Sequence, residues 1–499
     1  MTQSLLSLSV VELAERVRGG AVPAAEVADQ SLRAIRERSD LNAFCHVAEE
    51  AALTAARRLD EQRRSGRPLG KLAGVPIALK DALCTHDQPT SCGSRMLLRT
   101  GDDGREHGWR SPYDATVVER LRAEGAVLVG KANMDEFAMG SSSETCVYGP
   151  TRNPWDPERI PGGSSGGSAV AVAARLTSAS LGSDTGGSIR QPAALCGVVG
   201  VKPSYGRVSR YGLVAFASSL DQVGPMARDV RSAARVLEVI AGHDRKDSTS
   251  ADVPVGDYEA ACERGVSNLR FGVPAEYFGE GLDPSIRSAI EGVIAKLEAV
   301  GCAVTPVSLP HTDYGVATYY ILATAEASSN LARFDGVRFG KRVEAPGADL
   351  QAMYGASRNA GFGREVKRRI LLGTYVLSAG YYDAYYAKAQ RVRTLIRQDF
   401  DRVFQDVDVL ITPTSPTAAF RIGERLGDPL AMYMADVYTL PASLAGIPGI
   451  SIPCGLTTVQ DGRDSSPELP IGVQLLCPMF EEERLFAAAA GVEELVRST

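Results

Sequence analysis

The chain has 499 residues, of which 44% are hydrophobic and 23% charged, and its formal net charge is −6. This composition is typical of a globular protein, and it excludes a fibrous or low-complexity chain and a strongly basic nucleic-acid binder. Its nine cysteines form no CxxC pair, which argues against a zinc site and a dense disulfide framework and favours a reducing compartment.

The first part of the chain is predicted to be helical. Ser9 and Glu12 have the spacing of a capping box, and Gly19 and Gly20 follow the helix that it would begin. Apolar residues recur at helical spacing in three segments: 10–18, 24–38 and 47–65. The first segment lacks the apolar core of a signal peptide, and no stretch has the ~18 uninterrupted apolar residues of a membrane span. We therefore expect a cytoplasmic protein that does not associate with membranes.

Strands and helices alternate along the rest of the chain. Short apolar runs predict strands at 75–79, 126–129, 198–201, 213–216, 271–273, 407–411, 450–453 and 471–476. Helical spacing predicts helices at 168–175, 229–241, 284–300, 365–405 and 482–496. The polar stretch 101–110 is predicted to be a surface loop.

This alternation predicts an α/β fold with a central mixed sheet covered by helices on both faces. No repeat or linker divides the chain, so we expect one large domain over residues 1–499. Its predicted parts are an N-terminal helical segment at about 1–70, a catalytic core at about 71–245 and a remainder at about 246–499 that completes the sheet and the substrate pocket.

Ser188 is the first candidate for catalysis, because it ends the glycine-rich sequence Asp-Thr-Gly-Gly-Ser. Two glycines allow the backbone to bend sharply, and the N–H groups of Thr185, Gly186, Gly187 and Ser188 can then turn inward. Inward N–H groups are the donors of an oxyanion hole, each contributing ~3–4 kcal/mol to the transition state. A simple tight turn is the alternative interpretation.

Ser164 and Ser165 lie in a second loop of this kind, between two glycine pairs. The pattern matches the G-x-S-x-G nucleophile elbow, which needs a downstream histidine. The chain has five histidines, at positions 46, 86, 107, 243 and 311, and no local pattern marks any of them as a base. A histidine triad is therefore disfavoured.

Lys80 is the remaining candidate base, at the end of the apolar run Val-Pro-Ile-Ala-Leu. A lysine with its ordinary pKa near 10.4 is protonated at neutral pH, whereas a desolvated lysine can accept a proton. The alternative for Lys80 is a salt bridge to Asp81 or a solvated strand end.

The segment from Gly125 to Lys131 has the glycine–lysine spacing of a P-loop. However, a predicted strand stands in place of the phosphate-binding loop, and Ala132 replaces the Ser/Thr that binds Mg²⁺, so we reject a P-loop.

Lys80 and the two serine-bearing loops, in this order and with 24 residues between Ser164 and Ser188, resemble the amidase signature family. The resemblance implies a Ser–cis-Ser–Lys triad. In this triad Ser188 is the nucleophile, Ser164 is the bridging serine in a cis peptide, and Lys80 is the base. No metal ligand is implied in this chain.

Further segments resemble one branch of the family, the A subunits of the tRNA-dependent amidotransferases. They lie at 113–121, 133–141, 326–335, 361–370 and 380–386. The resemblance implies that the chain hydrolyses glutamine and sends ammonia to a B subunit. That partner uses ATP and Mg²⁺ to amidate misacylated Glu-tRNA(Gln) or Asp-tRNA(Asn), and a C subunit completes the assembly.

The resemblance also places glutamine recognition on Tyr320, Arg369 and Asp436, with Tyr319 and Arg368 as the alternatives if the register shifts by one. An arginine can bind the α-carboxylate bidentately, and an aspartate can hold the α-ammonium. Two rival interpretations are a stand-alone amidase for a neutral amide and a non-catalytic scaffold protein.

Overall fold

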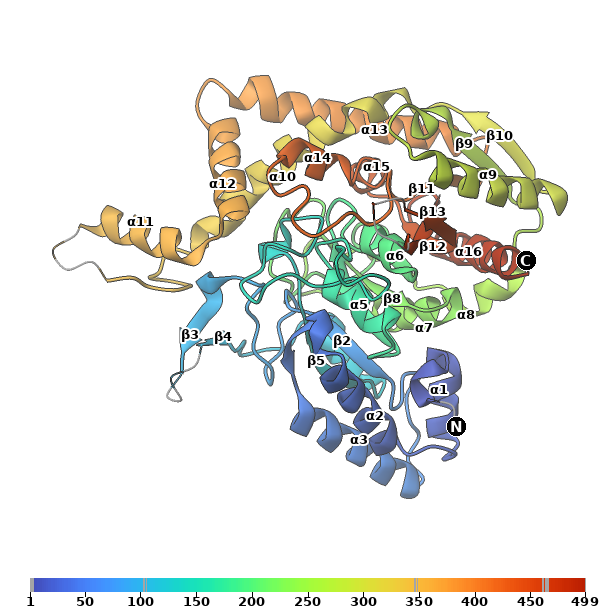
Figure 1. Cartoon of the computed structure of the whole chain (residues 1–499), viewed down its shortest axis with the longest axis horizontal. Coiled ribbons are helices and arrows are strands. Elements are labelled where there is room, and N and C mark those ends of the chain that lie inside the picture. Colours follow the sequence, from blue (N-terminus) through green and yellow to red (C-terminus); the bar gives the residue numbers. More distant parts are fainter. Residues whose placement is uncertain are drawn as a thin grey trace.

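A mixed sheet forms the centre of the molecule. The structure is a computed structural model that describes residues 4–101, 104, 106–344, 347, 349–459, 462 and 466–498. Across these residues eleven strands lie in the order β1-β5-β2-β6-β8-β7-β12-β13-β11-β9-β10 (Figure 1). Their bounds are β1 Phe44–Val47, β2 Pro76–Lys80, β5 Val127–Ala132, β6 Ala179–Asp184, β7 Val199–Lys202, β8 Gln222–Ala227, β9 Arg270–Pro274, β10 Ala303–Val307, β11 Val409–Pro413, β12 Gly449–Thr458 and β13 Glu468–Leu476.

Helices cover both faces of this sheet (Figure 1). Their bounds are α1 Val10–Arg18, α2 Ala24–Glu37, α3 Glu49–Arg64, α4 Thr116–Ala123, α5 Gly166–Ala173, α6 Arg190–Cys196, α7 Val230–Ile240, α8 Tyr258–Ala261, α9 Pro284–Ala299, α10 Gly315–Asn330, α11 Leu350–Gly361, α12 Arg364–Leu377, α13 Lys388–Val403, α14 Pro429–Met434, α15 Leu440–Ala445 and α16 Glu482–Arg497. In β5, Val127 and Val129 pack into one apolar cluster and Leu128 into another. Both faces are therefore buried, because alternate side chains of a strand point to opposite faces.

The predicted α/β class with helices on both faces is confirmed. The first helix begins with the predicted capping box, since Ser9 accepts the N–H of Glu12 and the Glu12 side chain accepts the N–H of Ser9. All nine cysteines are free thiols. Among the described residues, no helix is both long and apolar enough to cross a membrane.

Two predicted elements are wrong. Residues 213–216 form no strand, and only an isolated bridge joins Leu213 to Leu83. The predicted helix over 365–405 is broken: α12 ends at Leu377, a π-helix η9 (Tyr382–Ala387) follows, and α13 continues to Val403. Gly380 lies in the break with φ +87°, a conformation that interrupts a helix and favours glycine.

The predicted surface loop at 101–110 is partly a hairpin. Strand β4 (Glu106–Gly108) pairs antiparallel with β3 (Leu98–Thr100), outside the main sheet. Positions 102, 103 and 105 lie outside the described residues.

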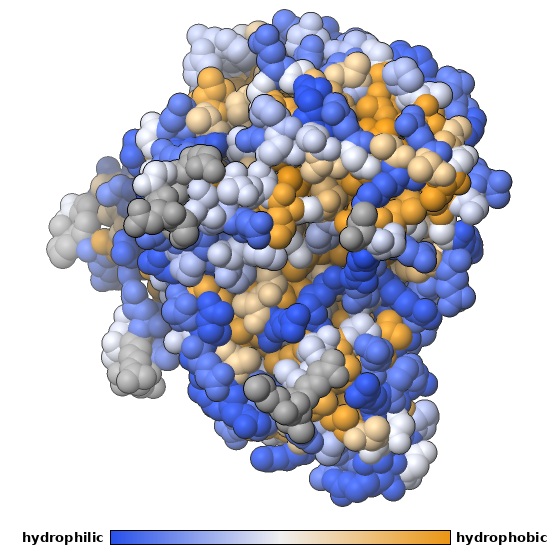
Figure 2. Space-filling model, turned by 45° about the vertical axis from the view of Figure 1, so that its right-hand side comes forward, coloured by the Kyte–Doolittle hydropathy of each residue, from blue (hydrophilic) through white to orange (hydrophobic). Residues whose placement is uncertain are grey.

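The face of the molecule drawn in Figure 2 is mainly hydrophilic, with scattered apolar patches.

Candidate active site

Lys80 is the last residue of β2, which lies between β5 and β6 in the sheet. Its side chain is completely buried, and Nζ lies 2.7 Å from Ser164 Oγ, 2.8 Å from Ser165 Oγ and 3.0 Å from Ser183 Oγ. Burial disfavours the ammonium and lowers the pKa of Lys80 to about 7, although nearby carboxylates, first that of Asp135, act in the opposite direction. A substantial fraction of the amine is therefore neutral near pH 7.

Asp81, the next residue, pairs with a different lysine. Its Oδ1 atom lies 3.6 Å from Nζ of Lys131 on β5, and its Oδ2 atom accepts the N–H of Ser91. Successive residues of an extended chain point in opposite directions, so Lys80 and Asp81 diverge. The salt-bridge alternative for Lys80 is wrong within the described part of the chain.

The Gly/Ser loop of residues 161–168, which contains Ser164, leads into α5. It carries a cis peptide bond between Gly163 and Ser164. Ser164 is fully buried, with its hydroxyl at Lys80. Gly163 lies against the carboxylate of Asp135, where an added Cβ would come within 2.2 Å of Oδ2. Asp135 in turn accepts the N–H of Ser143 at 2.8 Å. This close approach requires glycine at position 163.

The Gly/Ser loop of residues 183–190, which contains Ser188, connects β6 to α6. A buried ion pair joins its two ends. Arg190 donates from Nε and Nη2 to the two carboxylate oxygens of Asp184, each at 3.0 Å. Both side chains are fully buried, and Arg190 also donates to Gln474 and Ser443. Burial alone would raise the pKa of Asp184, but the Arg190 guanidinium holds it below its usual value. This bidentate pair fixes the loop between its ends.

Thr185, Gly186, Gly187 and Ser188 form the turn of this loop. The hydrogen bonds among the described residues leave the backbone N–H groups of all four without an acceptor. Such free N–H groups are uncommon in a protein interior and are available to an external oxyanion. The Ser188 side chain also makes no hydrogen bond to a described residue, and Ser188 is 8% exposed. The two loops touch where the Ser165 N–H donates to the Ser188 carbonyl at 3.2 Å.

Arg369 lies on the inner face of α12 and is only 3% exposed. Three aromatic rings surround its guanidinium, with Cζ at 5.3 Å from the Tyr320 ring, 5.4 Å from Tyr433 and 5.6 Å from Phe216. Its Nε donates to Glu365 at 2.9 Å, so one edge of the guanidinium is held by a carboxylate. The pKa of Arg369 is raised above its ordinary value because neighbouring tyrosines and Glu365 outweigh the effect of burial.

Asp436 lies beside the loop of residues 183–190. An added Cβ on Gly187 would be 3.3 Å from Asp436 Oδ1, a buried oxygen that has no hydrogen-bond partner among the described residues. The other oxygen accepts the hydroxyl of Ser141. Burial raises the pKa of Asp436 to about 7. A buried carboxylate oxygen without a partner is costly, and a cationic ligand group would satisfy it.

Neighbouring tyrosines on α10 contact different parts of the site. The Tyr320 ring stacks on Tyr433 with centroids 3.8 Å apart, beside Arg369. Tyr319 instead contacts the loop of residues 183–190, since an added Cβ on Gly186 would lie 2.7 Å from its Cζ. Arg368 is more exposed than Arg369 and pairs with Glu365. The structure therefore places Tyr320 and Arg369 together, while Arg368, with 28% of its side chain exposed, shares Glu365 with Arg369.

Several contributing residues were not among the predicted site residues: Ser141, Ser165, Ser183, Asp135, Asp221, Glu365 and Tyr433. Asp221 accepts the Thr185 hydroxyl at 2.7 Å, and burial raises its pKa to about 6. Glu365 could have been found from its i,i+4 spacing to Arg369 on a predicted helix. Tyr433 comes from a separate segment, so no local pattern links it to Arg369.

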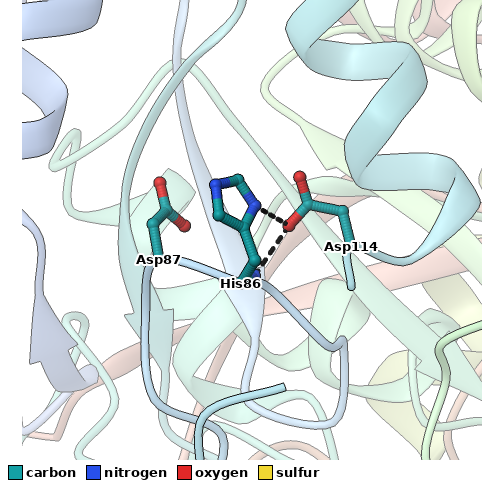
Figure 3. Close-up of side chains that lie close together, drawn as sticks. All are labelled: His86, Asp87 and Asp114. Atoms are coloured by element: carbon teal, nitrogen blue, oxygen red, sulfur yellow. Dashed lines mark hydrogen bonds and ion pairs between the residues drawn. The ribbon is translucent and has the colours of Figure 1, made fainter. Parts of the chain in front are cut away.

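The histidines that bond to carboxylates lie elsewhere. His86 Nδ1 lies 2.8 Å from Asp114, and Asp87 completes a small cluster (Figure 3). Arg122 already pairs with both carboxylates, at 2.7 Å from Asp87 and 3.2 Å from Asp114. We therefore assign this cluster no metal.

Two serine-bearing loops around a buried lysine, on a mixed α/β sheet, are features of an amide-hydrolysing enzyme. The chain belongs to the amidase family, whose model, described as Amidase, matches residues 26–486.

Two relatives and one solved structure are similar over nearly the whole chain. The A subunit of the glutamyl-tRNA(Gln) amidotransferase of Moorella thermoacetica is 57% identical over 91% of this chain and 89% of that protein. The protein of the same name from Acidobacterium capsulatum is 56% identical over 96% of this chain and 97% of its own length. A crystal structure of the corresponding protein from Thermotoga maritima has a TM-score of 0.78 and 40% identity, covering 99% of this chain and 96% of that one.

Proposed function

We propose that this chain is the glutaminase component of a tRNA-dependent amidotransferase. The observation that carries the proposal is a pair of buried charged groups. Asp436, beside the loop of residues 183–190, has one oxygen without a partner among the described residues, and Arg369 is enclosed by three aromatic rings. Free glutamine has a carboxylate and an ammonium next to an uncharged side-chain amide, which matches this pair. The relatives named as amidotransferase A subunits support the same assignment.

In this proposal Ser188, Ser164 and Lys80 act in sequence on the side-chain amide of glutamine. Neutral Lys80 takes the proton of the Ser188 hydroxyl through Ser164, and Ser188 Oγ attacks the amide carbon. The free N–H groups from Thr185 to Ser188 stabilise the tetrahedral oxyanion. The proton returns by the same route to the amide nitrogen, the C–N bond breaks, and ammonia leaves. Water then hydrolyses the glutamyl ester, releasing glutamate and restoring Ser188.

Substrate recognition follows from the charges. Arg369 binds the α-carboxylate, Tyr320 packs beside it, and Asp436 holds the α-ammonium. Glu365 already pairs with one edge of Arg369, whereas a neutral amide would leave one oxygen of Asp436 without a partner among the described residues. Burying that oxygen unpaired is costly, so the site favours an amino acid over the substrate of a stand-alone amidase. The reaction on this chain needs no cofactor, because the residues supply nucleophile, base and oxyanion hole.

The relatives are named as subunits, which implies a complex. We propose that residues 1–499 act as one amidase unit in the cytoplasm, joined to B and C subunits. The B subunit would receive the ammonia, use ATP and Mg²⁺, and bind the misacylated tRNA.

The test is ammonia release from glutamine by the purified chain, alone and with the B and C subunits, ATP and misacylated tRNA. We expect release that rises with the partners and tRNA. Turnover of simple neutral amides that is indifferent to partners would instead establish a stand-alone amidase. No turnover of either substrate would establish a scaffold protein.

A further inference from the structure

The outer face of α12 and the start of the next segment form a continuous apolar surface. On α12, Leu371 is 71% exposed, Leu372 44% and Tyr375 47%. Two further exposed tyrosines, Tyr381 and Tyr385, belong to the turn after α12 and to η9. We call these five residues the α12–η9 surface. A group of this kind on a folded chain is typical of a protein interaction site.

These side chains are exposed because the helix packs through its opposite face. Val366, Arg369, Gly373 and Val376 are the buried residues of α12. An added Cβ on Gly373 would lie 1.9 Å from the Thr324 carbonyl oxygen, so α12 approaches α10 closely there. The exposed leucines therefore cannot turn inward without breaking the contact between α12 and α10. In Figure 1, α12 stands at the edge of the molecule beside α10 and α14.

The tyrosines of the α12–η9 surface are held against one another. The Tyr375 ring centroid is 4.3 Å from that of Tyr381 and 6.2 Å from that of Tyr385. A mutually packed group of rings loses little conformational freedom when a partner covers it, and tyrosine is enriched in interface cores for this reason. The adjoining π-helix has no buried residue, and such π-helical turns occur frequently at functional sites.

Positive charge surrounds the surface, although the whole chain has a net charge of −6. Arg364 and Lys388 are exposed and make no hydrogen bond or ion pair with a described residue. Across the described ranges, Lys367 bonds only to the Asn359 amide oxygen, and Arg391 only to the backbone carbonyl of Ala387. Asp383 is the acidic residue within η9. A complementary partner would therefore carry apolar side chains flanked by Asp or Glu.

We propose that the α12–η9 surface is the docking site of another component of the amidotransferase, through an apolar segment with acidic flanks. This inference rests on the proposed function, which supplies the partner. Docking here would place that partner on the helix whose inner face holds Arg369, so the interface and the glutamine pocket share one rigid element.

The experiment measures binding directly, without catalysis. The full chain and its Leu371→Glu and Tyr381→Glu variants are titrated with purified B and C subunits of the same organism by calorimetry. Val300→Glu is the matched control, since Val300 is 53% exposed at the end of α9. Thermal unfolding midpoints verify that each variant is folded. We expect each surface variant to bind at least about tenfold more weakly than the wild type, with Val300→Glu unchanged. We also expect the wild-type affinity to fall as salt rises.

Wild-type affinity in both surface variants would overturn the docking site while leaving the glutaminase assignment intact. A wild-type chain that binds neither the B nor the C subunit would overturn the docking site and the assignment to a complex together. A chain that dimerises alone, and becomes monomeric on Leu371→Glu, would show that a second copy covers the surface instead and would overturn the proposal.

Discussion

Lys80 Nζ lies 2.7 Å from Ser164 Oγ, although the acidic residue next to it in the chain, Asp81, pairs with Lys131. The lysine is thus surrounded by hydroxyl groups in place of a carboxylate. Hydroxyl partners orient an amine without stabilising its charge as strongly as a direct ion pair would, so burial remains the largest influence on its pKa. The proposed role of Lys80 as a base depends on this arrangement.

We expect Ser188→Ala to lower glutamine turnover by about 10⁴-fold or more, because no other residue can take the role of the nucleophile. Ammonia release by the assembled complex measures it, and circular dichroism verifies the fold. His107→Ala is the control and should retain activity. Full turnover in Ser188→Ala would refute the assignment, and an inactive His107→Ala would revive a histidine mechanism.

Lys80→Ala should be nearly as damaging as Ser188→Ala. In the wild type, the rate of glutamine hydrolysis at saturating substrate should rise with pH through about 7, because deprotonation of Lys80 creates the base. The pH profile of kcat measures this. A kcat that is flat between pH 6 and 8 while the acylation step limits the rate would contradict the role of Lys80.

Asp436→Asn should raise the KM for glutamine by at least about tenfold, because a neutral amide cannot balance the α-ammonium. In the wild type, KM should rise as pH falls below about 7, where Asp436 becomes protonated. The variant should lose this pH dependence of KM while keeping the pH dependence of kcat from Lys80. Equal KM values for the two proteins at pH 8 would remove Asp436 from the pocket.

Arg369→Lys should also raise KM for glutamine by at least about tenfold, because an ammonium cannot bind a carboxylate bidentately between the rings. Arg368→Lys is the comparison, since Arg368 shares Glu365 with Arg369 but is more exposed and is not enclosed by the three rings. Steady-state kinetics of the complex compare the two. A larger effect at position 368 would shift the register of the pocket by one residue.

Asp184→Asn should destabilise the fold by about 3–5 kcal/mol, because Arg190 would keep its charge in a fully buried place. Denaturant unfolding at pH 7 measures the loss. Asp40→Asn removes an exposed ion pair and should cost less than about 1 kcal/mol. Since the pKa of Asp184 is depressed in the folded state, its contribution is present above the unfolded pKa and is lost as pH falls through the lower folded value. Equal stability of Asp184→Asn and the wild type at pH 7 would contradict the role of this pair.

The sequence by itself determined the α/β class, most of the strands and the candidate residues Lys80, Ser164 and Ser188, whose roles as a triad came from the resemblance to the amidase signature family. These features depend on local patterns: apolar runs for buried strands, helical spacing for amphipathic helices, and glycine pairs around the serines. It did not predict the break after Leu377, because the 365–405 segment keeps a helical apolar spacing on both sides of Gly380.

The tertiary structure alone decided which groups meet. It assigned Asp81 to Lys131, so that Lys80 is surrounded by Ser164, Ser165 and Ser183. It also stacked Tyr433 on Tyr320 and, within the part of the chain that the structure describes, left one oxygen of Asp436 without a hydrogen-bond partner. These contacts join segments far apart in the chain, and their geometry depends on how helices pack over the sheet. No local sequence pattern encodes such distances, and the same holds for the low pKa of Lys80, which comes from burial by the whole fold.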